Sequence, residues 1–82
     1  MPTSDITAEQ CRGARALLAM KREDLATASN VAHSTLADFE TGRRQPHPRT
    51  LDAVRTALEL AGIEFIEENG GGPGVRLRKG EA

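Results

Sequence analysis

Apolar residues recur three or four positions apart through residues 7–62 and alternate with polar ones in two short runs, 63–67 and 74–78. The first spacing is typical of helices with one buried face, and the second is typical of strands. In the first stretch, Thr7 and Gln10 have the spacing of a capping box, in which each residue bonds the other's backbone. This stretch predicts a helix over 8–20 with Arg12 and Arg15 on its polar side. Its apolar face is formed by Cys11, Ala14, Leu17 and Leu18.

Three more helices follow, at about 22–29, 33–41 and 49–61. Asn30 follows the second helix, and asparagine tolerates the left-handed backbone with which many helices end. Gly42 and Gly62 close the third and fourth helices for the same reason. Pro48 suits the first turn of the fourth helix, where a missing N–H costs little.

The last part of the chain has the pattern of a β-hairpin. Residues 63–67 and 74–78 alternate between apolar and charged side chains around a glycine-rich turn. One predicted face carries Ile63, Phe65, Val75 and Leu77, and the other carries Glu64, Arg76 and Arg78. The opposite charges on the polar face favour cross-strand pairing.

Residues 22–41 satisfy the requirements of a helix-turn-helix. Ala26 is a small residue at the point where the two helices must cross, and Asn30 suits the tight corner between them. Apolar residues stand on both sides of that corner, namely Leu25, Val31, Leu36 and Phe39. The segment therefore predicts a helix-turn-helix with the third helix as its second member.

The sequence around this segment resembles the lambda-repressor-like, Xre-type helix-turn-helix regulators over residues 7–62. The matching residues are Leu25-Ala26, Val31, Ser34-Thr35-Leu36, the run from Phe39 to Pro46, and Thr50-Leu51. The resemblance implies a compact, all-helical DNA-binding domain whose third helix enters the major groove. Members of this family usually carry glutamine at position 22, glycine at 30, and serine or threonine at 32. Here Arg22 adds a charge, Asn30 still tolerates the turn, and Ala32 removes a helix cap worth ~1 kcal/mol.

Together these patterns predict a mainly α fold: a four-helix, lambda-repressor-like domain followed by a C-terminal β-hairpin. We place the DNA-binding domain at 1–62, with its helix-turn-helix at 22–41, and a dimerisation hairpin at 63–82. A lone two-stranded hairpin is marginal in water, and its edges invite pairing with another chain. The proposed dimer contacts are Ile63, Phe65, Ile66, Val75 and Leu77. The alternative is a hairpin packed on the helices of its own chain.

Base contacts are expected from the outward face of the third helix, because Leu36 and Phe39 point inward. Hydroxyl, imidazole, carboxylate and methyl groups all have partners on base edges in the major groove. The predicted base-reading residues are His33, Ser34, Thr35, Ala37 and Asp38. Asp38 is the awkward member, since phosphates repel a carboxylate. Its alternative is to face solvent or to pair with a nearby arginine.

The basic residues bracket the third helix. The predicted phosphate contacts are Lys21, Arg22, Arg43, Arg44 and Arg49. For the loop that holds Arg43 and Arg44, the alternative is simple solvation. Within residues 21–49 there are five basic residues and four acidic ones, and the whole chain has a formal charge of −1. Non-specific DNA affinity should therefore be modest, and useful binding should depend on dimerisation.

Composition excludes several other classes. No apolar run approaches the ~20 residues of a membrane span, and the start of the chain lacks the pattern of a signal peptide. The single cysteine, Cys11, fits a reducing cytoplasm and a core position. His33 and His47 have no metal-ligand spacing, and the glycine run before Val75 lacks the lysine of a phosphate loop. We expect no catalytic set, metal, cofactor or small-molecule ligand.

The sequence thus predicts a cytoplasmic transcriptional regulator that binds double-stranded DNA as a homodimer. Its operator would be a near-palindrome with half-sites about 34 Å, or one DNA turn, apart. A rival interpretation is a protein-interaction module with this fold, such as an antitoxin or an anti-activator. A third is an architectural or excision factor that bends DNA, although the sequence shows no evident wedge residue.

Overall fold

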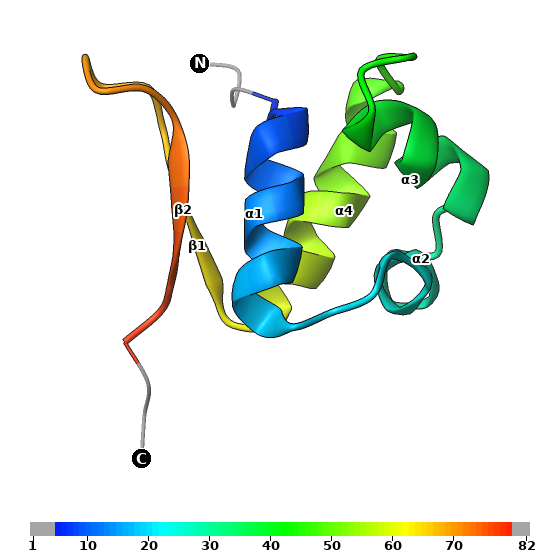
Figure 1. The fold of residues 1–82 in the computed structure, drawn as a ribbon, viewed down its shortest axis with the longest axis horizontal. Coiled ribbons are helices and arrows are strands. Elements are labelled where there is room, and N and C mark those ends of the chain that lie inside the picture. The colour runs from blue at the N-terminus through cyan, green and yellow to red at the C-terminus, as the bar shows by residue number, and fades with distance from the viewer. Residues whose placement is uncertain (1–4, 80–82) are drawn as a thin grey trace.

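In the computed structural model, which describes residues 5–79, four helices are followed by a two-stranded hairpin. The elements are α1 (Ala8–Leu18), α2 (Arg22–Ser29), α3 (His33–Glu40), α4 (Pro48–Leu60), β1 (Ile63–Ile66) and β2 (Gly74–Leu77). Figure 1 shows α1 and α4 side by side in the middle, with α2 and α3 on one side and the hairpin on the other. The predicted fold class is confirmed.

Local signals set the two ends of α1. The Thr7 hydroxyl accepts from the Gln10 N–H at 3.0 Å, and the Gln10 side chain accepts from the Thr7 N–H at 2.8 Å, so the predicted capping box is present. The helix ends at Leu18 rather than at residue 20, because Ala19 takes the left-handed conformation with φ of 55°. From there the Met20 N–H turns back to the Arg15 carbonyl at 2.9 Å.

The turn between α2 and α3 is as tight as the sequence predicts. Asn30 has φ of 59°, and Val31 begins the approach to α3 with its N–H on the Ala26 carbonyl. Ala32 provides no side-chain cap for α3. The third helix ends at Glu40, one residue earlier than predicted, with Thr41 as its C-cap and Gly42 at φ of 80°.

The fourth helix begins one residue earlier than predicted, at Pro48. The His47 Nδ1 accepts from the Arg49 N–H at 3.0 Å and caps the helix start. The helix ends at Leu60, and Gly62 has φ of 113°, the left-handed geometry predicted for the residue that closes it.

All four helices and the hairpin contribute to one apolar core. Its members are Ile6, Cys11, Ala14, Leu25, Leu36, Phe39, Leu51, Val54, Ala57, Leu58 and Ile63. The prediction for Leu17 is wrong, because this side chain is 44% exposed. Leu17 lies one helical turn beyond Gly13, which faces Val75, so it is level with Leu77, where β2 ends.

The hairpin packs against α1 and α4 by its apolar face. Its register opposes Ile63 to Leu77, Glu64 to Arg76 and Phe65 to Val75. The Gln10 side chain joins α1 to both strands, donating to the Gly74 carbonyl at 2.9 Å and to the Ile66 carbonyl at 3.3 Å. Both strands end one residue earlier than predicted.

Glycine at position 13 lets β2 approach α1, since a Cβ there would lie 3.4 Å from a Val75 methyl. On the polar face, the predicted Glu64–Arg76 pair forms at 2.6 Å. Arg78 departs from the predicted polar face, because its guanidinium donates to the Glu59 carbonyl at 3.0 Å. Cations are favoured at that site by the negative end of the α4 dipole.

Candidate nucleic-acid interface

The third helix has one anchored face and one open face. Leu36, Phe39 and Glu40 are 1–3% exposed and hold α3 on the rest of the protein. His33 and Ser34 are exposed, whereas Thr35, Ala37 and Asp38 are half-buried. Within residues 5–79, no side-chain hydrogen bond involves His33, Ser34 or Thr35. Their polar groups are therefore available to a ligand that lies along α3.

Basic side chains lie on the elements that adjoin α3. Arg43 and Arg44 are exposed in the loop that follows it, and Arg49 is exposed in the first turn of α4. The Asp38 carbonyl accepts from the N–H groups of Arg43, at 2.8 Å, and Arg44, at 3.3 Å. These two bonds hold the loop against the end of α3. The Asp38 carboxylate forms no ion pair among the described residues.

The start of α2 carries Lys21, which is exposed, and Arg22, which is half-buried. The Lys21 N–H already donates to the Asp24 carboxylate at 3.2 Å. The positive end of this helix is thus partly compensated within the protein. Any attraction for phosphate at this position falls mainly to the two basic side chains.

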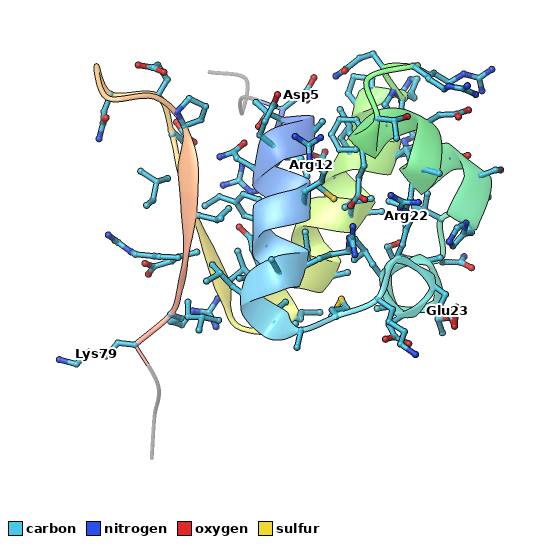
Figure 2. All side chains as sticks on the ribbon, viewed as in Figure 1. Asp5, Arg12, Arg22, Glu23 and Lys79 are labelled. Atoms are coloured by element: carbon cyan, nitrogen blue, oxygen red, sulfur yellow. The ribbon has the colours of Figure 1, made fainter. Side chains whose placement is uncertain are left out.

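A buried carboxylate ties α3 to α1 and α2. The Glu40 side chain has no exposed surface, and it accepts two hydrogen bonds from Arg15, both at 2.7 Å. Arg22 donates to the same carboxylate at 3.0 Å, and the Cys11 thiol also donates to it, at 3.0 Å. Figure 2 shows Arg22 extending from the start of α2 toward α3, while Glu23 points away from the other helices. Arg12 donates to the Glu40 backbone carbonyl.

The charges in this cluster stabilise one another. Burial by itself raises the pKa of Glu40, but hydrogen bonds from Arg15, Cys11 and Arg22 outweigh it, so the pKa lies below its usual value. The hydrogen bond to Glu40 raises the pKa of Arg15. Burial, followed by the bond to Glu40, raises the pKa of the Cys11 thiol. Glu40 is therefore a carboxylate, and Cys11 a neutral thiol, at neutral pH.

These elements carry the arrangement of a known family. The helix-turn-helix family model matches residues 12–65, which include α2, the turn and α3. The chain belongs to the helix-turn-helix family, in its Xre-type, lambda-repressor-like form. No curated protein matches the chain.

Membership makes this a DNA-binding helix-turn-helix regulator, from a family whose members are generally not enzymes. Within the described residues, no helix is long and apolar enough to cross a membrane. No cluster of three or more potential metal ligands occurs in residues 5–79.

The helix-turn-helix is positioned by residues whose role the sequence pattern does not reveal. Arg12 and Arg15 were expected on a polar face, yet both reach the C-terminal end of α3. Glu40 offers one signal, since an acidic residue in the last turn of a helix opposes the helix dipole. Such a residue calls for cationic partners, but helical periodicity does not say which arginines supply them.

The predicted dimer contacts differ in how far the chain's own fold covers them. Ile63 has no exposed surface, and Phe65 and Val75 pack against the core. The Arg55 guanidinium lies 5.1 Å from the centre of the Phe65 ring. Ile63 is therefore covered in this conformation, whereas the role of the whole set as dimer contacts stays a prediction. Ile66 remains half-exposed, and Leu77 is 50% exposed.

Proposed function

We propose that this chain is a sequence-specific transcriptional regulator that binds double-stranded DNA as a homodimer. Its operator is a near-palindrome whose half-sites lie one DNA turn, or a multiple of one, apart. It acts in the cytoplasm with no cofactor. The observation that supports this function best is the open polar face of α3 beside anchored Leu36 and Phe39.

Specificity in this proposal comes from α3. The side chains that reach the base edges are those of His33, Ser34, Thr35, Ala37 and Asp38. Ser34 is exposed and forms no bond within the described residues, so its hydroxyl is free for a base or a phosphate. Asp38 lies at the end of this surface, and its carboxylate accepts a hydrogen bond from the N4 amino group of cytosine.

Affinity comes from the basic residues around α3. Lys21, Arg43, Arg44 and Arg49 are exposed, and their ammonium and guanidinium groups neutralise phosphates on either side of the groove. Arg22 has a double role in this proposal. Its Nε holds Glu40, and the other guanidinium nitrogens of this 31% exposed side chain form no hydrogen bond within residues 5–79, which leaves them for the backbone of the DNA.

Selection from a pool of random duplexes at one fixed salt concentration tests this function. The wild-type chain should enrich one near-palindromic motif, and Ser34→Ala should change the preference at a single base pair in each half-site. Failure to retain any duplex at low salt, together with a stable complex with another protein, would overturn the proposal. That outcome would favour the protein-interaction module. Enrichment of an identical motif by Ser34→Ala would remove Ser34 from the base-reading set.

Salt titration tests the phosphate contacts. Arg43→Ala should weaken binding to all sequences and reduce the slope of log affinity against log salt by about one. The matched control is Lys79→Ala, which also removes one positive charge but lies beyond β2, on the far side of α1 from α3 (Figure 2). Equal slopes for Arg43→Ala and the wild type would exclude this contact.

A further inference from the structure

The outer edge of β2 has backbone groups without a partner. The Arg78 N–H donates to the Gly62 carbonyl at 2.7 Å, so residues 62 and 78 form a hydrogen-bonded pair. Such pairs alternate along an antiparallel ladder. The backbone groups of Val75 and Leu77 therefore point away from β1. Within residues 5–79, nothing bonds to them.

An exposed leucine pair lies beside this edge. Figure 1 shows α1 and β2 running in the same direction. Gln10 bonds Gly74, and Gly13 faces Val75, which sets the levels of the two elements. From Gly13 to Leu17 the helix rises by about 6 Å over four residues, and from Val75 to Leu77 the strand rises by about the same over two. Leu17 therefore lies at the level of Leu77. They are 44% and 50% exposed, and only Leu60 among the other large apolar residues described is comparably open.

We propose that β2 pairs antiparallel with β2 of a second copy of this chain, joining two hairpins into a four-stranded sheet. The pairing gives both backbone groups of Val75 a partner and lets the Leu77 N–H donate to the other copy, and it brings that copy against the Leu17–Leu77 pair. A two-fold axis gives each surface its own counterpart, as an isologous interface requires. The hairpin lies on the far side of α1 from α2 and α3, so the partner leaves α3 uncovered (Figure 1).

The charged residues of β2 allow two copies of this strand to pair, and they select the register of the pairing. Arg76 is paired with Glu64 at 2.6 Å, and Arg78 is drawn to the end of α4. A register centred on Arg76 would set two arginines directly opposite each other, which is destabilising. A register centred on Leu77 would oppose Arg76 to Arg78. The register centred on Val75 instead opposes Arg76 to Gly74, which has no side chain, and is the one we assign. It also opposes Leu77 to Pro73, whose carbonyl accepts from the Leu77 N–H but which has no N–H to donate in return.

The interface is small, because each copy contributes one four-residue strand and two leucines. It belongs to the weak class that buries less than about 1,200 Å². The expected dissociation constant lies between about 1 µM and 1 mM. Two half-sites on one DNA molecule would raise the local concentration of the two copies and favour the dimer. The use of this dimer on DNA rests on the proposed function, whereas the interface itself does not.

Sedimentation equilibrium without DNA tests the interface, over about 1 µM to 1 mM protein. The wild type should move from 8.8 kDa toward twice that mass as its concentration rises. Leu77→Lys and Leu17→Lys, on different elements, should each weaken dimerisation at least tenfold. The matched control is Leu60→Lys, which removes an 84% exposed leucine. Leu60 lies about 200° around α4 from buried Leu58, so it points away from the core.

Circular dichroism melts should show that all three variants keep the wild-type fold, since each replaced side chain is largely exposed. A wild type that stays at 8.8 kDa up to about 1 mM would overturn the interface. Equal dimerisation by Leu60→Lys, Leu77→Lys and the wild type would also overturn it.

Binding to DNA separates this inference from the proposed function. Leu77→Lys should bind a single half-site like the wild type but lose cooperative binding to the two-half-site operator. Dimerisation without retention of any DNA would refute the proposed function and leave the β2 interface standing. Selective DNA binding by a protein that remains monomeric and shows no cooperativity would refute the β2 interface and the homodimer, and would leave sequence-specific DNA binding standing.

Discussion

Replacing Glu40 with glutamine should destabilise the protein strongly, although the two side chains have nearly the same size. The Glu40 carboxylate has no exposed surface and is contacted by two guanidinium groups and a thiol. The substitution removes the negative charge and leaves Arg15 and Arg22 facing a neutral amide. Arg15 is then the main source of the loss, because its side chain is only 18% exposed.

The magnitude follows from burial. Removing one partner of a buried ion pair costs about 3–5 kcal/mol, because the remaining charge stays out of water without compensation. Glutamine retains one carbonyl acceptor, and Arg22 is 31% exposed, so we expect about 3 kcal/mol. A chain of 82 residues has a total stability of roughly 4–12 kcal/mol. The loss corresponds to a fall in melting temperature of about 12–24 °C.

The hairpin supplies the control. Glu64 and Arg76 form an ion pair at 2.6 Å, at least as short as the Arg15–Glu40 bonds, but their side chains are 46% and 67% exposed. Glu64→Gln should cost no more than about 1 kcal/mol, as exposed pairs do. Urea unfolding followed by circular dichroism gives both values. Equal losses from the two substitutions would refute the reasoning, because burial would then not distinguish them.

Three further predictions concern the same fold. Ala19→Gly should stabilise the protein by about 1 kcal/mol in thermal melts, because Ala19 has φ of 55°, whereas Asn30→Gly should gain less, since asparagine tolerates that geometry. The lowered pKa of Glu40 stabilises the fold at any pH above about 4.3, the pKa of a glutamate in the unfolded chain. The free energy of unfolding should therefore fall as the pH drops below that value, and it should fall less in Glu40→Gln, which has no carboxylate to protonate at this position. The raised pKa of Cys11 gives its full stabilisation at any pH below about 8.5, the pKa of a cysteine in the unfolded chain. The free energy of unfolding should decline as the pH rises above that value. Urea unfolding at several pH values should show this decline in the wild type and not in Cys11→Ala.

Much of the fold is predictable because its signals are local. The Thr7–Gln10 capping box, the left-handed Asn30 and the closing Gly62 each depend on a few neighbouring residues, and all three occur as expected. The early end of α1 was missed because alanine rarely adopts the left-handed conformation. Ala19 does so here as the C-cap of α1, and the Met20 N–H then bonds the Arg15 carbonyl as the chain leaves for α2.

Contacts between distant residues were less predictable. Arg15 and Arg22 lie 25 and 18 positions from Glu40, and no periodicity relates them. The hairpin's apolar face was expected to meet a partner, because an alternating strand pattern says which side chains share a face but not what covers them. The cover is α1, and the signals were Gly13, which makes room for Val75, and Gln10, which binds both strands.

The sequence by itself determined the helix-turn-helix, its corner, the order of the elements and the residue types on the open face of α3. Short-range backbone preferences and apolar spacing suffice for these features. Only the tertiary structure decided which charges are buried together around Glu40 and which leucines stay open. The physical reason is that burial depends on which surfaces meet. Leu17 and Leu58 belong to equally apolar patterns, yet one is 44% exposed and the other fully buried.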